Sequence, residues 1–133
     1  MSDPKCARIL VEAAERDLSA LRGMTDEKVF ADEIAGFLAQ QATEKLVKAW
    51  IALLGESYPI THDIAQLLEV LTARQSPGLD LSALVELTPY AVRFRYAGRV
   101  PDAPALDRAK AVARIEELLK QVRSRLESGS EDA

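Results

Sequence analysis

Three groups of polar residues in this chain could bind or act on an anionic substrate. The first lies on a predicted helix, where Gln41, Lys45 and Lys48 are spaced i, i+4 and i+7 and therefore share one face. Glu44 precedes Lys48 by four residues, which is the better order for a helical ion pair. This face is either a solvated surface with one ion pair, worth about 0.3–0.5 kcal/mol, or a cluster in which Lys45 or Lys48 meets a phosphate.

The second group surrounds His62, the only histidine of the chain. Thr61 is the predicted cap of a helix that starts here, and Asp63 falls in its first turn, where a negative charge favours the positive end of the helix dipole. One interpretation is structural, with His62 bonded to backbone or to Glu44. The other is that His62 contacts a nucleotide or acts as an acid/base group.

The third group is the segment 90–99, which holds three arginines, three aromatic residues and no acid. Arginine charge suits phosphates, and flat aromatic rings suit bases. Alternatively, Tyr90 and Phe94 pack inward while the arginines pair with acids of the last helix or of a second subunit. If the segment binds a ligand, the candidate residues are Tyr90, Arg93, Arg95 and Tyr96.

Other common sites have no support in the sequence. Neither glycine-rich phosphate-loop pattern occurs. One histidine and one cysteine cannot form an ordinary His/Cys metal site. Cys6 and His62 are far apart in sequence, which argues against a Cys–His nucleophile. We therefore expect no metal and no cofactor.

The composition predicts a single helical domain in residues 1–127, followed by a disordered polar tail, 128–133. The chain is 48% hydrophobic with few aromatics, and its net charge of −4 argues against a general duplex-DNA surface. One cysteine and no apolar run of about 18 residues favour a cytoplasmic protein without a membrane segment.

Apolar residues recurring at three and four positions predict the helices. We expect the first to begin at Pro4 and to end at Gly23 in the left-handed conformation, and the second to be capped by Asp26 and to end at Gly55. The other expected elements are a helix capped by Thr61, a short helix from Asp80, a helical turn after Pro89, and a last helix over 104–126.

Long helices with short connections fold back on their neighbours, so the predicted fold is all-α, an up-and-down bundle of four to five helices. In the last helix, apolar residues step by three and four, which predicts a core seam that a dimer interface could share. The expected core face of the second helix comprises Phe30, Ile34, Phe37, Leu38, Ala42, Leu46, Ala49, Trp50, Leu53 and Leu54.

Three segments in this order resemble the HEPN family (higher eukaryotes and prokaryotes nucleotide-binding), over roughly residues 4–126. They are residues 37–49, the turn 58–64 and residues 87–96. The resemblance implies a helical bundle, commonly a homodimer, often working with a minimal nucleotidyltransferase. The polar residues that match the family's positions are Glu44, Lys45, Lys48, His62, Asp63, Tyr90, Arg93 and Tyr96.

Some HEPN members are toxins that cut RNA without metal, and they resemble each other in an arginine followed by a histidine four to six residues later. This sequence departs from that pattern, because the arginine nearest before His62 is Arg22. We therefore expect a non-catalytic partner of a nucleotidyltransferase, in a toxin–antitoxin-like pair, that binds a nucleotide or RNA. The alternatives are a ribonuclease using His62 with Arg93 or Arg95, and a purely structural interaction module.

Overall fold

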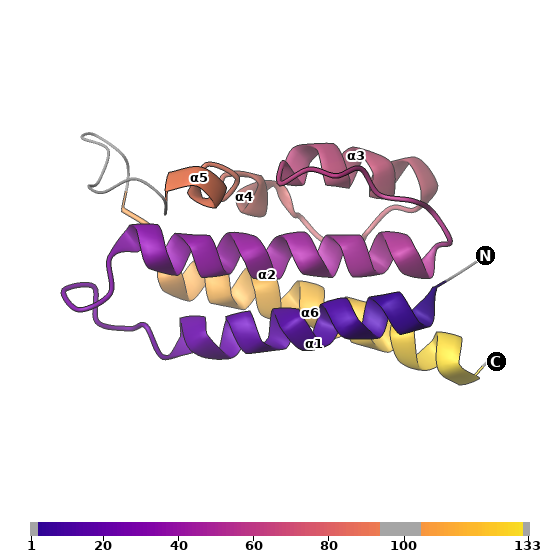
Figure 1. Ribbon diagram of the computed structural model, residues 1–133, viewed down its shortest axis with the longest axis horizontal. Coiled ribbons are helices and arrows are strands. Elements are labelled where there is room, and N and C mark those ends of the chain that lie inside the picture. The colour runs from indigo at the N-terminus through magenta and orange to yellow at the C-terminus, as the bar shows by residue number, and fades with distance from the viewer. Residues whose placement is uncertain (1–2, 94–104, 132–133) are drawn as a thin grey trace.

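The protein is described from a computed structural model that covers residues 3–93 and 105–131. Every regular element in these two ranges is a helix, and no strand occurs in them. Figure 1 shows α1, α2 and α6 as long rods, with α3, α4 and α5 arranged along the other side of α2. The all-α helical bundle expected from the sequence is confirmed.

Helix α1 (Pro4–Arg22) begins where the sequence predicted. Asp3 caps it by accepting a hydrogen bond from the Cys6 amide at 3.0 Å. The prediction for Gly23 was wrong, because this residue has a φ of −77°, in the right-handed region. Its amide donates back to the Ala20 and Leu21 carbonyls, so the helix ends without a left-handed residue.

Helix α2 (Asp32–Leu53) begins later than the predicted cap at Asp26. The Asp26 side chain instead accepts from the Lys28 amide at 2.9 Å, closing a separate turn in the α1–α2 connection. At the other end Gly55 has a φ of +78°, which confirms that a glycine terminates this helix. Ile34 was expected in the core but is 38% exposed, because it lies in the first turn of α2, off its buried face.

Helix α2 is the central element, because it contacts α1, α3, α5 and α6. Small residues, among them Ala35, Ala39 and Ala42, let the neighbouring helices approach it closely. Trp50 is fully buried at its C-terminal end, where its indole N–H donates to Gln75 at 3.0 Å and the Arg125 guanidinium lies 4.5 Å from its ring.

Three shorter helices follow: α3 (Ile64–Arg74), α4 (Ser82–Val85) and α5 (Tyr90–Arg93). Thr61, the predicted cap of α3, is two residues too early, because Asp63 is the N-cap and accepts from the Ala65 amide at 3.0 Å. The Thr61 hydroxyl instead accepts a hydrogen bond from the Asp63 amide, in the turn that precedes the helix.

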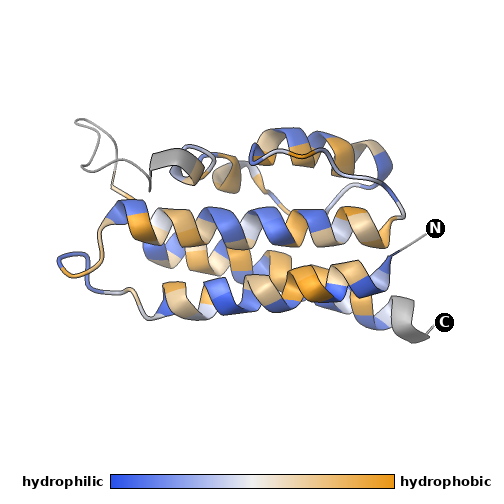
Figure 2. Ribbon diagram, viewed as in Figure 1, coloured by the Kyte–Doolittle hydropathy of each residue, from blue (hydrophilic) through white to orange (hydrophobic). Residues whose placement is uncertain are grey.

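Helix α6 (Arg108–Glu131) differs from its predicted bounds at both ends. Asp107 precedes it and accepts from the Lys110 amide at 3.0 Å, so residues 105–107 are outside the helix. The helix continues through Glu131, where we expected a disordered tail from residue 128. Its apolar seam is core, as Ile115 and Val122 have no exposed surface. Figure 2 shows how apolar and polar residues alternate along the helices.

Arg108 joins the start of α6 to the connection between α1 and α2. Its guanidinium donates to the Met24 carbonyl at 2.6 Å and to the Asp32 carboxylate at 3.0 Å. It also donates to the Phe30 carbonyl. The side chain is 9% exposed, so this pair is held largely out of water. None of the helices in the described ranges is both long and apolar enough to cross a membrane.

Gly36 on α2 is packed against the ring of Tyr90 on α5. A Cβ at this position would lie 2.6 Å from the Tyr90 Cε1 atom and closer still to Cδ1. We expect Gly36→Ala to lower the free energy of unfolding by about 1–3 kcal/mol, because the overpacking outweighs the roughly 1 kcal/mol that alanine normally adds within a helix. Urea denaturation followed by circular dichroism measures the change.

Gly23→Ala is the matched control for this substitution. A Cβ on Gly23 would meet only the Ala20 carbonyl, at an ordinary 3.4 Å, and its φ suits alanine. We expect Gly23→Ala to be neutral or slightly stabilising. Equal stability of the two variants would contradict the close packing of α5 on α2.

Candidate functional site

A line of residues spaced by four runs along one face of α2: Gly36, Gln40, Glu44 and Lys48. Residues spaced by four lie above one another on a helix. This line, here called the polar stripe, faces Tyr90 at one end and the segment 58–63 along the rest. It brings Glu44 and Lys48 of the first predicted group next to His62 of the second, whereas Tyr90 of the third lies at its far end, on Gly36.

Glu44 is the centre of the polar stripe, and only 4% of its surface is exposed. Its Oε1 atom accepts from Gln40 Nε2 at 3.0 Å and lies 2.7 Å from His62 Nδ1. Its Oε2 atom accepts from Lys48 Nζ at 3.2 Å. The sequence predicted the Glu44–Lys48 pair and offered Glu44 as a partner of His62, and both contacts are present, although in a buried setting and not on a solvated face.

These contacts keep the Glu44 carboxylate ionised. Burial raises the pKa of Glu44, but the hydrogen bonds from Gln40 and His62 and the charge of Lys48 lower it by more. The net result is a pKa below the ordinary value of 4.5. Glu44 is thus a buried anion compensated from three sides.

His62 is held at two atoms but still faces solvent. Its carbonyl accepts from Gln40 Nε2 at 3.1 Å, and its ring is bonded to Glu44 through Nδ1. Because an ionised carboxylate can only accept, Nδ1 carries the proton and Nε2 is left for an outside partner. With the side chain 69% exposed, the imidazole presents an oriented nitrogen to a ligand.

Lys48 is largely satisfied within the protein. Besides its pair with Glu44, its ammonium lies 5.5 Å from the centre of the Tyr58 ring. The Tyr58 hydroxyl in turn lies 3.8 Å from Cys6 Sγ, and burial and this contact raise the pKa of Tyr58. Lys48 therefore shares its charge with Glu44, and little of it is left for a phosphate.

The other predicted ligand residues are divided among different places. Lys45 leaves the stripe and pairs with Asp17 of α1 at 2.6 Å, joining the two helices. The Asp63 carboxylate caps α3 and is thus engaged with backbone. Tyr90 is 7% exposed and packs on Gly36, about 12 Å along the helix axis from Glu44 at roughly 1.5 Å per residue.

Arg95, Tyr96 and the side chain of Arg93 lie outside the described residues. The prediction that they join His62 in one site therefore stays a prediction. Among the residues that are described, no hydrogen bond or ion pair connects an arginine to His62.

Sequence reasoning missed Gln40 and Tyr58, although a signal for Gln40 was present. The recurrence of Gly36, Gln40, Glu44 and Lys48 at intervals of four marks one face of α2, and an amide there can bridge a carboxylate and a loop carbonyl. Tyr58 gave no such signal, because its contact with Lys48 depends on the path of the loop.

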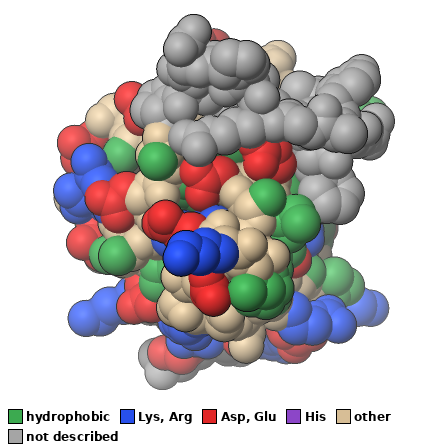
Figure 3. All heavy atoms as spheres, turned by 90° about the vertical axis from the view of Figure 1, so that its left-hand side faces the viewer, with side chains coloured by type: hydrophobic (Ala, Val, Ile, Leu, Met, Phe, Trp, Pro, Cys, Tyr) green, Lys and Arg blue, Asp and Glu red, His purple; other side chains and the backbone are tan. Residues whose placement is uncertain are grey.

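The described surface shows neither a metal cluster nor a broad basic area on the face that Figure 3 views. No group of three or more His, Cys, Asp or Glu side chains in the described ranges could hold a metal ion. Acidic and basic side chains are interspersed at the end of the bundle shown in Figure 3.

Acid should remove the contribution of Glu44 to stability. Because the pKa of Glu44 is lower in the folded state than its ordinary 4.5, the stabilisation is fully present above that pH and is lost as the pH falls through the folded value. We expect the free energy of unfolding to fall below about pH 4.5, and Glu44→Gln to lose less of it over the same range. At pH 7 the variant should be about 1–3 kcal/mol less stable.

Chemical denaturation at intervals from pH 7 to pH 3 measures both effects. Glu69→Gln, on an exposed side chain of α3, is the control and should follow the wild-type profile. If Glu44→Gln and the wild type lost stability in parallel, the buried carboxylate would not be the group responsible.

The comparisons with known proteins agree with this architecture. A family model described as the HEPN domain matches residues 7–127. Searches of curated proteins and of solved structures found no match. The matched range includes the whole of α2 with its polar stripe, and the His62 turn. The chain therefore belongs to the HEPN domain family.

Proposed function

We propose that this HEPN domain binds a nucleotide or similar anion and acts, without catalysis, as the partner of a minimal nucleotidyltransferase. In this proposal the pair is a toxin–antitoxin-like system of the cytoplasm, and the HEPN chain is a homodimer. Membership of the family supports a nucleotide-binding or ribonuclease-type function. The finer statements extend that assignment by analogy with other family members.

The observation that carries the binding proposal is the exposed imidazole held by a buried carboxylate. A buried anion is costly, and a core of apolar residues is as stable without one. Glu44 orients a ring that lies mostly in solvent and contributes little to packing. We infer that the buried carboxylate serves to orient His62 for a ligand. The group that binds at His62 Nε2 would be a phosphate oxygen or the edge of a base.

Two observations favour a binding role over catalysis. The sequence lacks an arginine four to six residues before His62, the pattern shared by the ribonuclease members of the family. In addition, Lys48 is already paired with Glu44, so it cannot supply a full free charge to a developing phosphorane.

An exposed apolar residue beside the site supports a protein partner. Ile60, two residues before His62, has its whole side chain in solvent. Burying an isoleucine side chain contributes about 1.5–3 kcal/mol. A partner that covered this turn would gain that contribution while lying next to the bound ligand.

Metal-independent ribonuclease activity is the second candidate, and one observation favours it. The Glu44–His62 pair occupies Nδ1 and leaves Nε2 of a largely exposed ring for an outside group, as acid/base catalysis requires. In that mechanism His62 would move a proton at Nε2, and Arg93 or Arg95 would stabilise the transition state.

Titration with ATP tests the binding proposal. We expect wild-type protein to bind ATP, and His62→Ala to weaken binding by at least about fivefold, roughly the loss of one hydrogen bond of 1 kcal/mol. Isothermal titration calorimetry measures the dissociation constants.

Lys120→Ala, an exposed lysine on α6 away from the polar stripe, is the matched control and should leave the dissociation constant unchanged. Absence of ATP binding to the wild type at about 5 mM would rule out the nucleotide part of the proposal.

Incubation with RNA distinguishes the two candidates. Wild type and His62→Ala should both leave a labelled single-stranded RNA intact in the presence of EDTA, because the arginine–histidine pattern is absent. Gel electrophoresis of the products gives the answer. Cleavage by the wild type that His62→Ala abolishes would establish the ribonuclease and reject the non-catalytic role.

A further inference from the structure

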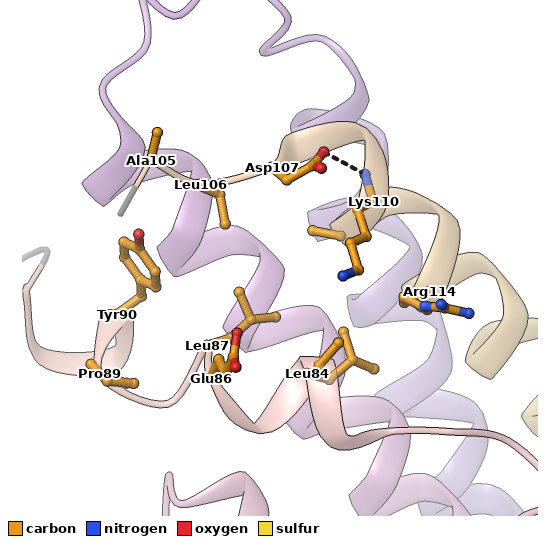
Figure 4. Close-up of a pocket in the computed structure, with 12 residues that line it drawn as sticks. Leu84, Glu86, Leu87, Pro89, Tyr90, Ala105, Leu106, Asp107, Lys110 and Arg114 are labelled. Atoms are coloured by element: carbon orange, nitrogen blue, oxygen red, sulfur yellow. Dashed lines mark hydrogen bonds between the residues drawn. The ribbon is translucent and has the colours of Figure 1, made fainter. Parts of the chain in front are cut away.

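A pocket of about 540 Å³ lies between α4, α5 and the beginning of α6, and His62 is not among its lining residues (Figure 4). Its size falls in the range of roughly 300–1,000 Å³ found for small-molecule sites. Every residue that lines it belongs to the described ranges. The polar stripe does not extend into it, so its chemistry is separate from that of Glu44 and Lys48.

The floor of the pocket is apolar. Leu84, Leu87 and Ala111 line it and are themselves at least nine-tenths buried, and Leu106 and Tyr90 complete the surface. Leucine and tyrosine side chains here can cover the faces of a flat ring. The pocket therefore suits a ligand with an apolar or aromatic body.

Two cations stand on one wall. Lys110 and Arg114 are four residues apart on α6 and both line the pocket (Figure 4). The Lys110 ammonium makes no hydrogen bond or ion pair with any described residue, and Arg114 makes only an ion pair at 3.6 Å with the half-exposed Glu117. These cations are accordingly available to an anionic group.

The positive charges of Lys110 and Arg114 also affect the pKa of the nearby Asp80 carboxylate. The pKa of Asp80 is lowered by its hydrogen bonds to Ser82, and additionally by the charges of Arg114 and Lys110. An anion near this wall is therefore stabilised by both side chains.

A carboxylate stands on the opposite wall. Glu86, in the connection between α4 and α5, lines the pocket, and no ion pair joins it to Lys110 or Arg114. The other acidic residue, Asp107, is engaged at the start of α6 through the Lys110 amide. A ligand with an anion at one end should therefore carry a hydrogen-bond donor at the other.

We propose that this pocket is a nucleotide site separate from His62, with the phosphate on Lys110 and Arg114, the base on the leucine floor, and an exocyclic amine donating to Glu86. This inference goes beyond the binding proposed at His62, because it adds a second location with a preference for bases that carry an amine. Inorganic phosphate would leave the floor empty. A fatty acid would leave the Glu86 carboxylate against an alkyl chain without a donor, which is unfavourable.

Calorimetric titration of the full chain with AMP, CMP, UMP and inorganic phosphate tests the location. We expect Lys110→Ala/Arg114→Ala to weaken AMP binding at the pocket by at least about tenfold, because two charge-assisted contacts are lost. Lys120→Ala, farther along the same helix, is the matched control and should bind as the wild type. Lys110 and Lys120 are exposed and Arg114 is partly exposed, so circular dichroism should show that both variants keep their helices.

CMP and UMP form a matched pair that tests the preference for bases with an amine. The cytosine of CMP carries an exocyclic amine at the position where the uracil of UMP carries a carbonyl. CMP should bind the wild type more tightly than UMP, and Glu86→Ala should remove the difference. Inorganic phosphate should bind more weakly than either nucleotide. Equal binding of CMP and UMP by the wild type would reject the role of Glu86.

Nuclear magnetic resonance of the wild-type protein shows where AMP binds without the need for a substitution. AMP should shift the methyl signals of Leu84 and Leu87 as well as the His62 ring signals, and Lys110→Ala/Arg114→Ala should remove only the leucine shifts. If AMP shifts the His62 signals alone, the pocket is not a nucleotide site but the proposed function stands. If no nucleotide binds the wild type at about 5 mM, both proposals fail.

Discussion

The burial of Glu44 is the constraint on which the rest of this site depends. Removing a carboxylate from water costs several kcal/mol unless other groups replace its hydration. Here a neighbouring amide, an ammonium and an imidazole do so, from Gln40, Lys48 and His62. Two of these partners lie on the same helix, but the third must come from elsewhere in the chain. The segment between α2 and α3 is therefore held against α2, and the histidine cannot turn freely.

The central position of α2 explains why the two candidate regions are close but distinct. One face of this helix carries the polar stripe and meets the His62 turn. At the Gly36 end the same face receives the Tyr90 ring, whose helix also forms a wall of the pocket at the start of α6. Tyr90 thus packs on α2 and also lines the pocket that holds Lys110 and Arg114. A ligand in either place would contact an element that packs directly on α2.

The family assignment and the geometry contribute different things to the functional argument. Membership of the HEPN family establishes the type of fold and narrows the function to nucleotide-binding or ribonuclease-type roles. A fold by itself supports many functions, so the choice between them has to come from the residues. In this chain the relevant residues are an oriented and largely exposed histidine, an internally paired lysine, and a lysine beside an apolar pocket that makes no ion pair with any described residue.

Much of this protein follows from its sequence, because helical periodicity and capping are local. The start of α1 at Pro4, the end of α2 near Gly55 and the Glu44–Lys48 pair each depend on residues within a few positions of one another. The tertiary structure decided what depends on packing. It directed Lys45 toward Asp17 and Lys48 toward Tyr58, and it placed Arg108 against the carbonyls of the α1–α2 connection. Neighbours distant in sequence determine which polar groups lose water and which groups replace it, and no local pattern records those neighbours.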